Sequence, residues 1–245
     1  MMERIQKVIA NSGVCSRRKA EELLINNKVK VNGKIVNELG YKVKSKDIIE
    51  VNGKIIRKED KEYFLLNKPR GVISSTSDEK NRTTVVDLID TDKKIFPVGR
   101  LDYDTTGLIL LTNDGEFSNI ITHPKNKIEK EYVAKIDGVL NKELINICKK
   151  GIVIDNRKVY VKKIKTKKVN KSSNTSIITI TICDGKNHEV KKILNHIGFN
   201  CLKLKRERIA FFTLNNLGSS KYRKLNPKEV GKVYSLKKID KKNEI

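Results

Sequence analysis

Two carboxylates stand close together in a short stretch near the middle of the chain. Asp102 and Asp104 lie between Gly99 and Gly107, two residues that allow tight backbone turns, and Arg100 precedes them. A carboxylate so placed can act as a nucleophile or as a base, and loops at the ends of buried strands often carry reacting groups. The same residue types are also typical of an ordinary turn, which is the more frequent explanation on composition alone.

The residues after this stretch predict a strand. Residues 108–111 are continuously apolar, as in a strand that is buried on both faces. The chain after residue 60 alternates apolar stretches with polar turns, so we expect an α+β domain rich in strands. Further strands are expected at residues 63–66, 132–136, 159–164, 177–182, 202–205 and 209–212.

Helices are expected between several of these strands. Asn141 is a suitable N-cap for a helix over residues 142–150, and Gly151 ends it. A polar and basic stretch, residues 165–176, is expected to form a mobile hairpin loop. The other helices are expected as a short one at Val85, Val86, Leu88 and Ile89, one over residues 116–122, one that carries Val190, Ile193, Leu194 and Ile197, and a last one opened by Pro227.

The N-terminal part has the pattern of a small separate unit. Residues 5–13 show apolar side chains at helical spacing, and Ser16 can cap a second helix. Asn-Gly pairs at residues 32–33 and 52–53 each separate two short apolar stretches, which predicts two β-hairpins. The charged run 57–61 is expected to be a linker. We therefore expect two domains, at residues 1–60 and 61–240.

The protein carries a large excess of positive charge. Lys and Arg number 53 against 29 Asp and Glu, which gives a formal net charge of +24. Such a surface attracts polyanions, so nucleic acid is the leading class of partner and an anionic membrane surface the second. The membrane alternative is weaker, because the sequence lacks an amphipathic segment with a broad apolar face.

Sequence patterns argue against several other classes of protein. We expect neither a membrane span nor a signal peptide, because no run of about 18 apolar residues exists and the N-terminus lacks an apolar core. The four cysteines include no CxxC pair, which disfavours zinc and fits a reduced cytoplasmic compartment. With only three histidines, a multi-histidine metal cage or a catalytic histidine triad is disfavoured. We expect a monomer, since no heptad pattern or unpaired apolar face stands out.

A family resemblance changes the interpretation of the two carboxylates. Residues 99–115 resemble the central motif of the RsuA/RluB family of ribosomal RNA pseudouridine synthases. Residues 13–21 are similar to the S4 RNA-binding domain that this family carries. Further segments resemble family motifs in the family's order: residues 66–72, 130–134, 184–192 and 203–209. One departure is Ala210, where the family usually has Gly.

The resemblance implies a fold and a reaction. The fold is a small S4-like α/β module followed by a mixed, mainly antiparallel β-sheet catalytic domain with flanking helices. The reaction breaks the bond from ribose C1′ to uracil N1 and remakes it from C1′ to C5, without a cofactor or metal. The absence of a P-loop, a GxGxxG turn and a His/Cys cluster agrees with this. The resemblance assigns the catalytic carboxylate to Asp102, as a nucleophile at the sugar or as a base that removes a sugar proton.

Asp102 must stay ionised while it is largely shielded from water, which calls for a cationic partner. The resemblance places an arginine or lysine of the last motif opposite the aspartate, and the candidates are Arg206 and Arg208. We favour Arg206, although regular strand alternation would point both to the same face. Either could bind a phosphate instead. Asp104 is expected to hold Asp102 in place through the loop.

The remaining site residues follow from the need to flip a uridine out of its stack. The resemblance makes Tyr132 the wall on which the base stacks, and Ile209 a plausible second wall. Arg100 is expected to occupy the gap left by the base or to bind its phosphate. Lys68 and Asn187 are expected to contact the RNA backbone or to brace the site.

Other basic residues are expected to bind RNA more generally. A helix start with Lys186, His188, Lys191 and Lys192 would form a basic wall, where the helix dipole also favours phosphate; a solvated helix face is the alternative. In the N-terminal unit the candidates are Arg4, Lys7, Arg17, Arg18 and Lys19.

The sequence leaves two functions to compare. The first is a pseudouridine synthase for ribosomal RNA, and Phe211 and Phe212 resemble the large-subunit branch more than the small-subunit branch. The second is a non-catalytic S4-domain RNA-binding or ribosome-assembly factor. Asp102, Tyr132 and Arg206 favour the enzyme, because a pure binding protein has no need for all three.

We predict that charge reversal at Arg17 and Arg18 weakens RNA affinity and reduces its dependence on salt. Each phosphate contact releases counterions, so fewer contacts give a smaller slope of log Kd against log salt concentration. RNA titrations at several salt concentrations measure this slope. A slope unchanged from the parent protein would show that the N-terminal unit does not touch RNA.

Overall fold

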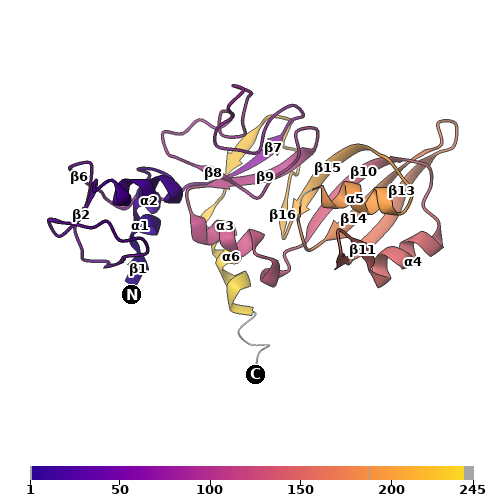
Figure 1. Ribbon diagram of the computed structural model, residues 1–245. Helices are drawn as coiled ribbons and strands as arrows, with labels where there is room; N and C mark the ends of the chain where they lie inside the picture. Colours follow the sequence, from indigo (N-terminus) through magenta and orange to yellow (C-terminus); the bar gives the residue numbers. More distant parts are fainter. Residues whose placement is uncertain (1, 187, 240–245) are drawn as a thin grey trace. The chain divides into compact units, whose positions relative to one another are not determined.

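The computed structural model describes residues 2–186 and 188–239, and the chain divides into two compact units (Figure 1). The first unit holds the residues up to Glu62 together with the short segments Asp92–Lys94 and Asn113–Gly115. The second unit holds the rest of the chain from Tyr63 onward. No helix within the described part of the chain is long and apolar enough to cross a membrane.

The first unit combines two helices with short antiparallel strands. Ser16 caps the second helix, and its hydroxyl accepts a hydrogen bond from the Lys19 backbone N–H at 3.2 Å. The pairs at 32–33 and 52–53 take positive φ angles and close the two predicted hairpins. One sheet has the order β3-β2-β5-β6, and β1 pairs with β4. The elements are β1 (Met2–Arg4), α1 (Ile5–Asn11), α2 (Arg17–Ile25), β2 (Val29–Val31), β3 (Lys34–Ile35), β4 (Lys42–Lys44), β5 (Ile49–Val51) and β6 (Lys54–Ile55).

In the described residues of the second unit, nine strands form one mixed sheet. Its main path is β13-β14-β10-β15-β9-β7-β17, with β16 on β15 and β8 on β9. The pairing of β15 with β9 is parallel and the other pairings are antiparallel. The strands are β7 (Tyr63–Lys68), β8 (Phe96–Val98), β9 (Thr106–Thr112), β10 (Lys130–Asp137), β13 (Lys163–Asn170), β14 (Thr175–Ile182), β15 (Cys201–Ile209), β16 (Phe212–Thr213) and β17 (Tyr222–Lys224).

Helices flank this sheet, so the α+β class and the mainly antiparallel sheet are confirmed. Asn141 caps α4 by accepting a hydrogen bond from the Leu144 N–H at 2.9 Å. A separate hairpin pairs β11 (Ile152–Ile154) with β12 (Arg157–Val159). The helices are α3 (Gly115–Thr122), the 3-10 helix η1 (Pro124–Asn126), α4 (Lys142–Lys150), α5 (Glu189–His196) and α6 (Pro227–Ile239).

Strand β9 lies at the centre of the core, because it is buried on both faces as predicted. Ile109 and Leu111 join a cluster that includes Ala134 of β10 and Ile193 of α5, whereas Leu108 and Leu110 pack with α3 and α6. Along β10 the residues alternate between buried and partly exposed. The half of the sheet that contains β10 therefore has one covered face and one face toward solvent.

Several predicted elements are corrected by the structure. No helix forms at residues 85–89: Thr84 instead pairs with Ile73 in a β-bridge, and Asp87 accepts hydrogen bonds from the Thr84 backbone and hydroxyl. Apolar spacing alone did not distinguish a buried turn from a helix here.

Several segments form longer strands, or strands with other bounds, than their sequence predicts. Residues 165–176 form most of the β13–β14 hairpin, and the strand expected over 159–164 divides between β12 and β13. The strand expected over 202–205 continues as β15 to Ile209, where 209–212 was expected as a separate strand. Pairing to neighbouring strands decided these segments, because their polar side chains can face solvent while the backbone completes the sheet.

Gly107 is predicted to be intolerant of any side chain. Its φ is +107°, and a Cβ at this position would lie 2.2 Å from the Arg206 carbonyl oxygen. We expect Gly107→Ala to separate β9 from β15 and to lower the free energy of unfolding by about 1–3 kcal/mol or more. Thermal and urea unfolding measure the loss. Gly231→Ala in α6, where no atom lies within 4 Å of the added Cβ, is the control, and equal stability of the two variants would contradict this account.

Candidate active site

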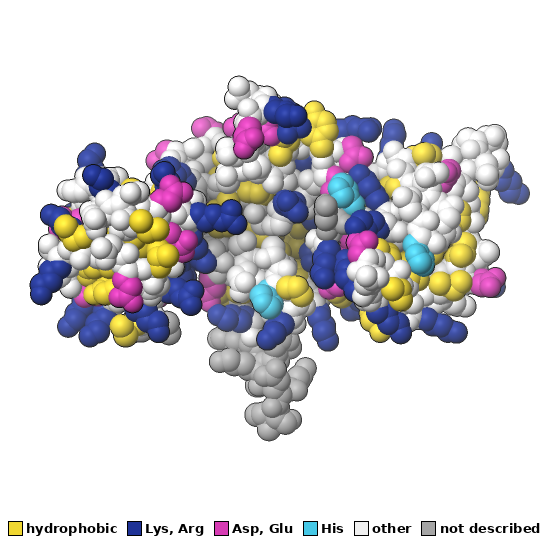
Figure 2. Space-filling view, viewed as in Figure 1, with side chains coloured by type: hydrophobic (Ala, Val, Ile, Leu, Met, Phe, Trp, Pro, Cys, Tyr) yellow, Lys and Arg dark blue, Asp and Glu magenta, His cyan; other side chains and the backbone are white. Residues whose placement is uncertain are grey.

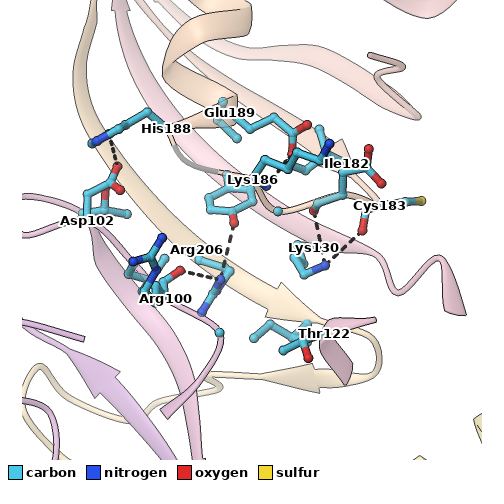
Figure 3. Close-up of a pocket in the computed structure, with 18 of the residues that line it drawn as sticks. Arg100, Asp102, Thr122, Lys130, Ile182, Cys183, Lys186, His188, Glu189 and Arg206 are labelled. Carbon is cyan, nitrogen blue, oxygen red and sulfur yellow. Dashed lines mark hydrogen bonds and ion pairs between the residues drawn. The ribbon is translucent and has the colours of Figure 1, made fainter. Parts of the chain in front are cut away.

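A pocket in the second unit collects the residues that the sequence singled out. It opens where the loop after β8, the start of β10, the end of β14, the end of β15 and the start of α5 come together (Figure 3). The predicted residues that line it are Arg100, Asp102, Tyr132, Arg206 and Ile209, together with Lys186 and His188 of the expected basic wall. Segments more than 100 residues apart in sequence therefore meet at one site.

The Asp102 carboxylate lies between a histidine and a lysine. Its Oδ2 is 3.1 Å from His188 Nδ1 and 3.3 Å from Lys191 Nζ, and the Thr105 hydroxyl donates to it at 3.4 Å. The side chain is 22% exposed, so the carboxylate is only partly shielded, which corrects the expected dry environment. The Lys191 ammonium therefore places a positive charge beside the carboxylate, and the His188 imidazole lies within hydrogen-bonding distance of it.

Arg206 does not form the expected ion pair with Asp102. Its side chain is buried, and Nε donates to the Leu108 carbonyl at 2.8 Å. Nη1 donates to the Arg100 carbonyl at 3.5 Å and to the Tyr132 hydroxyl at 3.4 Å. Nη2 is buried and has no hydrogen-bond partner among the described residues. Backbone and phenol oxygens, rather than the carboxylate, thus hold this guanidinium.

A β-bulge explains why Arg206 and Arg208 point to different places. Tyr132 faces Arg206 while Glu131 faces Arg208, so β15 carries one extra residue at this point. The bulge breaks the regular alternation and brings Arg206 and Ile209 to the same pocket. Arg208 instead contacts Glu129 at 3.1 Å. The expectation that Arg208 shares a face with Arg206 is therefore wrong, and Arg208 is not among the residues that line this pocket.

Lys68 lies beneath the loop that carries Asp102. The side chain is fully buried, and Nζ donates to the carbonyls of Asp102 at 3.1 Å, Thr105 at 2.9 Å and Pro69 at 3.1 Å. Burial lowers the pKa of the Lys68 ammonium to about 8. A fully buried lysine cannot reach an RNA backbone, so of the two roles expected for it the structure supports bracing.

Tyr132 and Ile209 form apolar walls of the pocket together with Ile182 and Leu204. Tyr132 is 6% exposed, and its ring centroid lies 6.0 Å from the guanidinium carbon of Arg206. Arg100 is exposed and lines the pocket. Asn187, the remaining predicted contact, lies outside the described residues.

Lys191 and Lys130 make contacts in this site that the sequence did not predict. Lys191, predicted only to bind RNA, bridges Asp102 to Asp104, whose carboxylate it contacts at 2.6 Å. The hydrogen bond from Lys191 lowers the pKa of Asp104. Lys130 is buried in the pocket wall and donates to the Cys183 carbonyl at 3.0 Å, and burial lowers its pKa. The alternation of β10 could have placed Lys130 on the buried face.

The other predicted RNA-binding residues lie outside this pocket. Lys192 pairs with Asp155, Lys7 with Glu3, and Lys19 with Glu22. Arg4, Arg17 and Arg18 are exposed in the first unit. Lys and Arg side chains outnumber acidic ones on the visible surface (Figure 2), in keeping with the net charge.

Lys68→Met is predicted to destabilise the loop in a pH-dependent way. We expect a lower free energy of unfolding, by about 2–4 kcal/mol, because buried carbonyls lose their donor. The pKa of Lys68 is about 8 in the folded protein and about 10.4 in the unfolded chain. Between these pH values Lys68 is protonated in the unfolded chain and largely deprotonated in the folded protein, so the free energy of unfolding rises with pH. The contribution of Lys68 to the free energy of unfolding therefore increases as pH rises from about 8 to 10.5.

Urea unfolding of the parent and the variant at pH 7, 8, 9 and 10 measures this difference. Lys142→Met, at an exposed position of α4, is the control and should show no such trend. A difference between parent and Lys68→Met that is constant from pH 7 to 10 would contradict the buried, pKa-shifted state of Lys68.

Comparisons with known proteins agree with this architecture. Residues 62–196 match the RNA pseudouridylate synthase family model, and residues 3–49 match the S4 domain model. The chain is 50% identical to ribosomal large subunit pseudouridine synthase B of Bacillus subtilis, over 96% of this chain and 97% of that protein. It is 35% identical to the dual-specificity RNA pseudouridine synthase RluF of Escherichia coli, over 95% of this chain and 79% of that protein.

A solved structure shows a similar fold. A crystal structure of a pseudouridylate synthase matches with a TM-score of 0.67 at 28% identity, over 94% of this chain and 99% of that one. Family models, relatives and fold thus agree on the family of this chain. The chain belongs to the RNA pseudouridylate synthase family and is a pseudouridine synthase with an N-terminal S4 domain.

Proposed function

We propose that this protein converts a specific uridine of ribosomal RNA to pseudouridine, and that Asp102 is its catalytic carboxylate. The observation that carries the proposal is the placement of Asp102 in a pocket with Tyr132 and the buried Arg206. The relative from Bacillus subtilis is named for the large ribosomal subunit, which supports a large-subunit substrate. The resemblance of Phe211 and Phe212 to the large-subunit branch points the same way.

The pocket fits a uridine that has been turned out of its stack. The apolar walls around Tyr132 suit a flat uracil ring, which must stay in place while it is detached from the sugar. Arg100, at the exposed side, is placed to occupy the gap in the RNA or to contact a phosphate. Lys130, Ile182 and Ile209 complete the wall around the base.

The carboxylate of Asp102 reacts at the ribose. As a nucleophile it would bond to C1′ while the C1′–N1 bond breaks, and the new bond would break in turn when C5 attacks C1′. As a base it would remove a sugar proton while N1 leaves, and would return this proton when the C1′–C5 bond forms. The proton on C5 is then lost and N1 gains a proton, so the reaction consumes nothing. Lys191 and His188 both contact Oδ2 of the carboxylate and hold it in position before substrate enters. The partly exposed position leaves it accessible to a ribose.

Arg206 acts as a fixed positive charge in the pocket wall. Its hydrogen bonds to the Arg100 and Leu108 carbonyls hold it in place, and its contact with the Tyr132 hydroxyl orients the ring for stacking. Nη2 of Arg206 has no hydrogen-bond partner among the described residues, so it can donate to the substrate, or to the Asp102 carboxylate if that side chain changes its position. Lys68 and Asp104 are positioning residues, since they act through the loop and through Lys191.

The S4 domain is proposed to supply RNA affinity through Arg4, Lys7, Arg17, Arg18 and Lys19. Lys192 and Lys191 would add positive charge near the pocket. Phosphate contacts of this kind give affinity and orientation rather than base specificity. Ribosomal RNA as substrate places the enzyme in the cytoplasm.

Asp102→Asn is predicted to abolish product while RNA binding is retained. The amide keeps the size of the side chain but can act neither as a nucleophile nor as a base, so we expect at least a 10³-fold loss of rate. Pseudouridines are mapped in both ribosomal RNAs from cells that have the parent protein, the variant or neither, and RNA affinity is measured by titration.

Asp104→Asn is the matched control, because it removes the same charge from the same loop but outside the lining of the pocket. We expect it to keep pseudouridine formation at a reduced rate. Product from Asp102→Asn would show that the catalytic residue lies elsewhere. Identical pseudouridine maps with and without the protein would reject ribosomal RNA as its substrate, and would favour a binding or assembly role on the ribosome.

A further inference from the structure

The sheet that carries the pocket has a second, basic face. The strand registers place Lys168 of β13, Lys135 of β10 and Lys203 of β15 in one row across the sheet, with Ile177 of β14 between the first two. The neighbouring row holds Lys165, Thr179, Val133 and Lys205 in the same order. We call Lys135, Lys163, Lys165, Lys168 and Lys203 the lysine face.

The lysine face is the side of the sheet that faces solvent. On β10 the buried residues Tyr132, Ala134 and Ile136 alternate with partly exposed ones, and Lys135 belongs to the second set. The buried set packs with apolar residues of α4 and α5, which lie along these strands in Figure 1. Among the described residues, no apolar cluster covers the opposite side. The pocket therefore opens on one side of the sheet and the lysine face lies on the other.

The charges of this face are poorly balanced. The carboxylates on and beside it already have partners: Glu131 contacts Arg208, Glu207 contacts Lys205 and Lys167, Glu129 contacts Lys162, and Asp137 accepts hydrogen bonds from Asn200. Within the described part of the chain, no acidic group lies within 4.0 Å of the five lysines of the lysine face.

One pair in this face is unfavourable by itself. Lys135 and Lys203 are directly opposite each other on neighbouring antiparallel strands. Such positions lie about 5 Å apart, and like charges there destabilise the sheet. A single lysine at the edge strand β13 can be explained as protection against edge-to-edge pairing. That explanation does not extend to Lys135 and Lys203, whose strands lie inside the sheet.

We propose that the lysine face binds the phosphodiester backbone of a second RNA segment, apart from the one that enters the pocket. The face offers ammonium groups on three strands over a floor of Val133, Ile177 and Thr179, and it has no aromatic side chain on which a base could stack. Contacts are therefore made to phosphates and carry no base specificity. A bound polyanion relieves the repulsion between Lys135 and Lys203.

RNA fits this face better than a membrane does. The chain has an S4 domain and an RNA pseudouridylate synthase domain, so RNA is present near this surface whenever the enzyme works. A membrane surface would require apolar side chains that insert beside the lysines. The apolar floor residues Val133 and Ile177 are half-buried β-branched side chains that are shorter than the lysines around them, and Thr179 is only 3% exposed. The inference does not depend on which uridine is modified.

The test compares two triple variants in the Asp102→Asn background, where turnover cannot occur. One carries Lys135→Gln, Lys168→Gln and Lys203→Gln. The control carries Lys142→Gln, Lys149→Gln and Lys150→Gln on α4, which removes the same charge from exposed positions on the helix side of the sheet. The probe is a labelled 60-nucleotide oligouridylate, titrated at salt concentrations from 50 to 300 mM.

We expect the lysine-face variant to lose at least 10-fold in affinity at 100 mM salt and the control less than threefold. Three lost contacts should also reduce the slope of log Kd against log salt by about 2, since each contact on a single strand contributes about 0.7. The melting temperature of the lysine-face variant without RNA should be unchanged or higher, because the Lys135–Lys203 repulsion is removed.

A direct readout comes from acetylation of the protein with and without the oligouridylate, followed by mass spectrometry. RNA should protect Lys135, Lys168 and Lys203 but leave Lys142 and Lys149 reactive. Equal losses of affinity in both triple variants would attribute the effect to net charge and overturn the proposal.

A second outcome would also overturn the proposal. If the parent protein binds phosphatidylserine vesicles, and the lysine-face substitutions abolish this binding but leave RNA affinity unchanged, the face binds membranes. Neither of these two outcomes would change the pseudouridine maps expected for the parent protein and for Asp102→Asn. The lysine face and the proposed reaction are thus tested separately.

Discussion

The parallel contact between β9 and β15 is the constraint on which the site depends. It joins the β13-β14-β10-β15 half of the sheet to the β9-β7-β17 half through the register Lys205–Thr106 and Arg206–Gly107. Gly107 permits this approach because the Arg206 backbone occupies the space where a Cβ would stand. The loop with Asp102 ends at β9, and Arg206 and Ile209 project from β15. The pocket therefore exists only while these two strands are paired.

Buried cations hold the reactive loop from within. Lys68 satisfies loop carbonyls from below, and the Arg206 guanidinium satisfies those of Arg100 and Leu108. Both cations are buried among backbone oxygens rather than carboxylates. Because a buried donor or acceptor without a partner is costly, these bonds restrict the loop to one conformation. The carboxylate of Asp102 meanwhile contacts Lys191 and His188 at the start of α5, so its immediate partners come from outside the loop.

The two sides of the sheet carry different side chains because successive residues of a strand point to opposite faces. On β10, Tyr132 faces the pocket while Lys135 belongs to the lysine face. On β15, Arg206 and Lys203 divide in the same way, and the bulge after Arg206 then returns Ile209 to the pocket side. The same strands thus line an apolar pocket on one side and carry a row of ammonium groups on the other.

The sequence by itself determined the elements whose signals are local. Asn-Gly hairpins, the caps at Ser16 and Asn141 and the apolar run of β9 all lie where they were predicted, and the motif around Asp102 identified the loop of the pocket. Local spacing could not reveal the β13–β14 hairpin, the full length of β15 or the absence of a helix at residues 85–89. Their conformation depends on backbone pairing with distant strands. The partners of Asp102, the separation of Arg206 from Arg208 and the burial of Lys68 were likewise decided by tertiary structure. The bulge in β15 separates Arg206 from Arg208, the buried ammonium is that of Lys68, and the start of α5 supplies the partners of Asp102. Each depends on which segments of the chain meet, and no single stretch of residues contains that information.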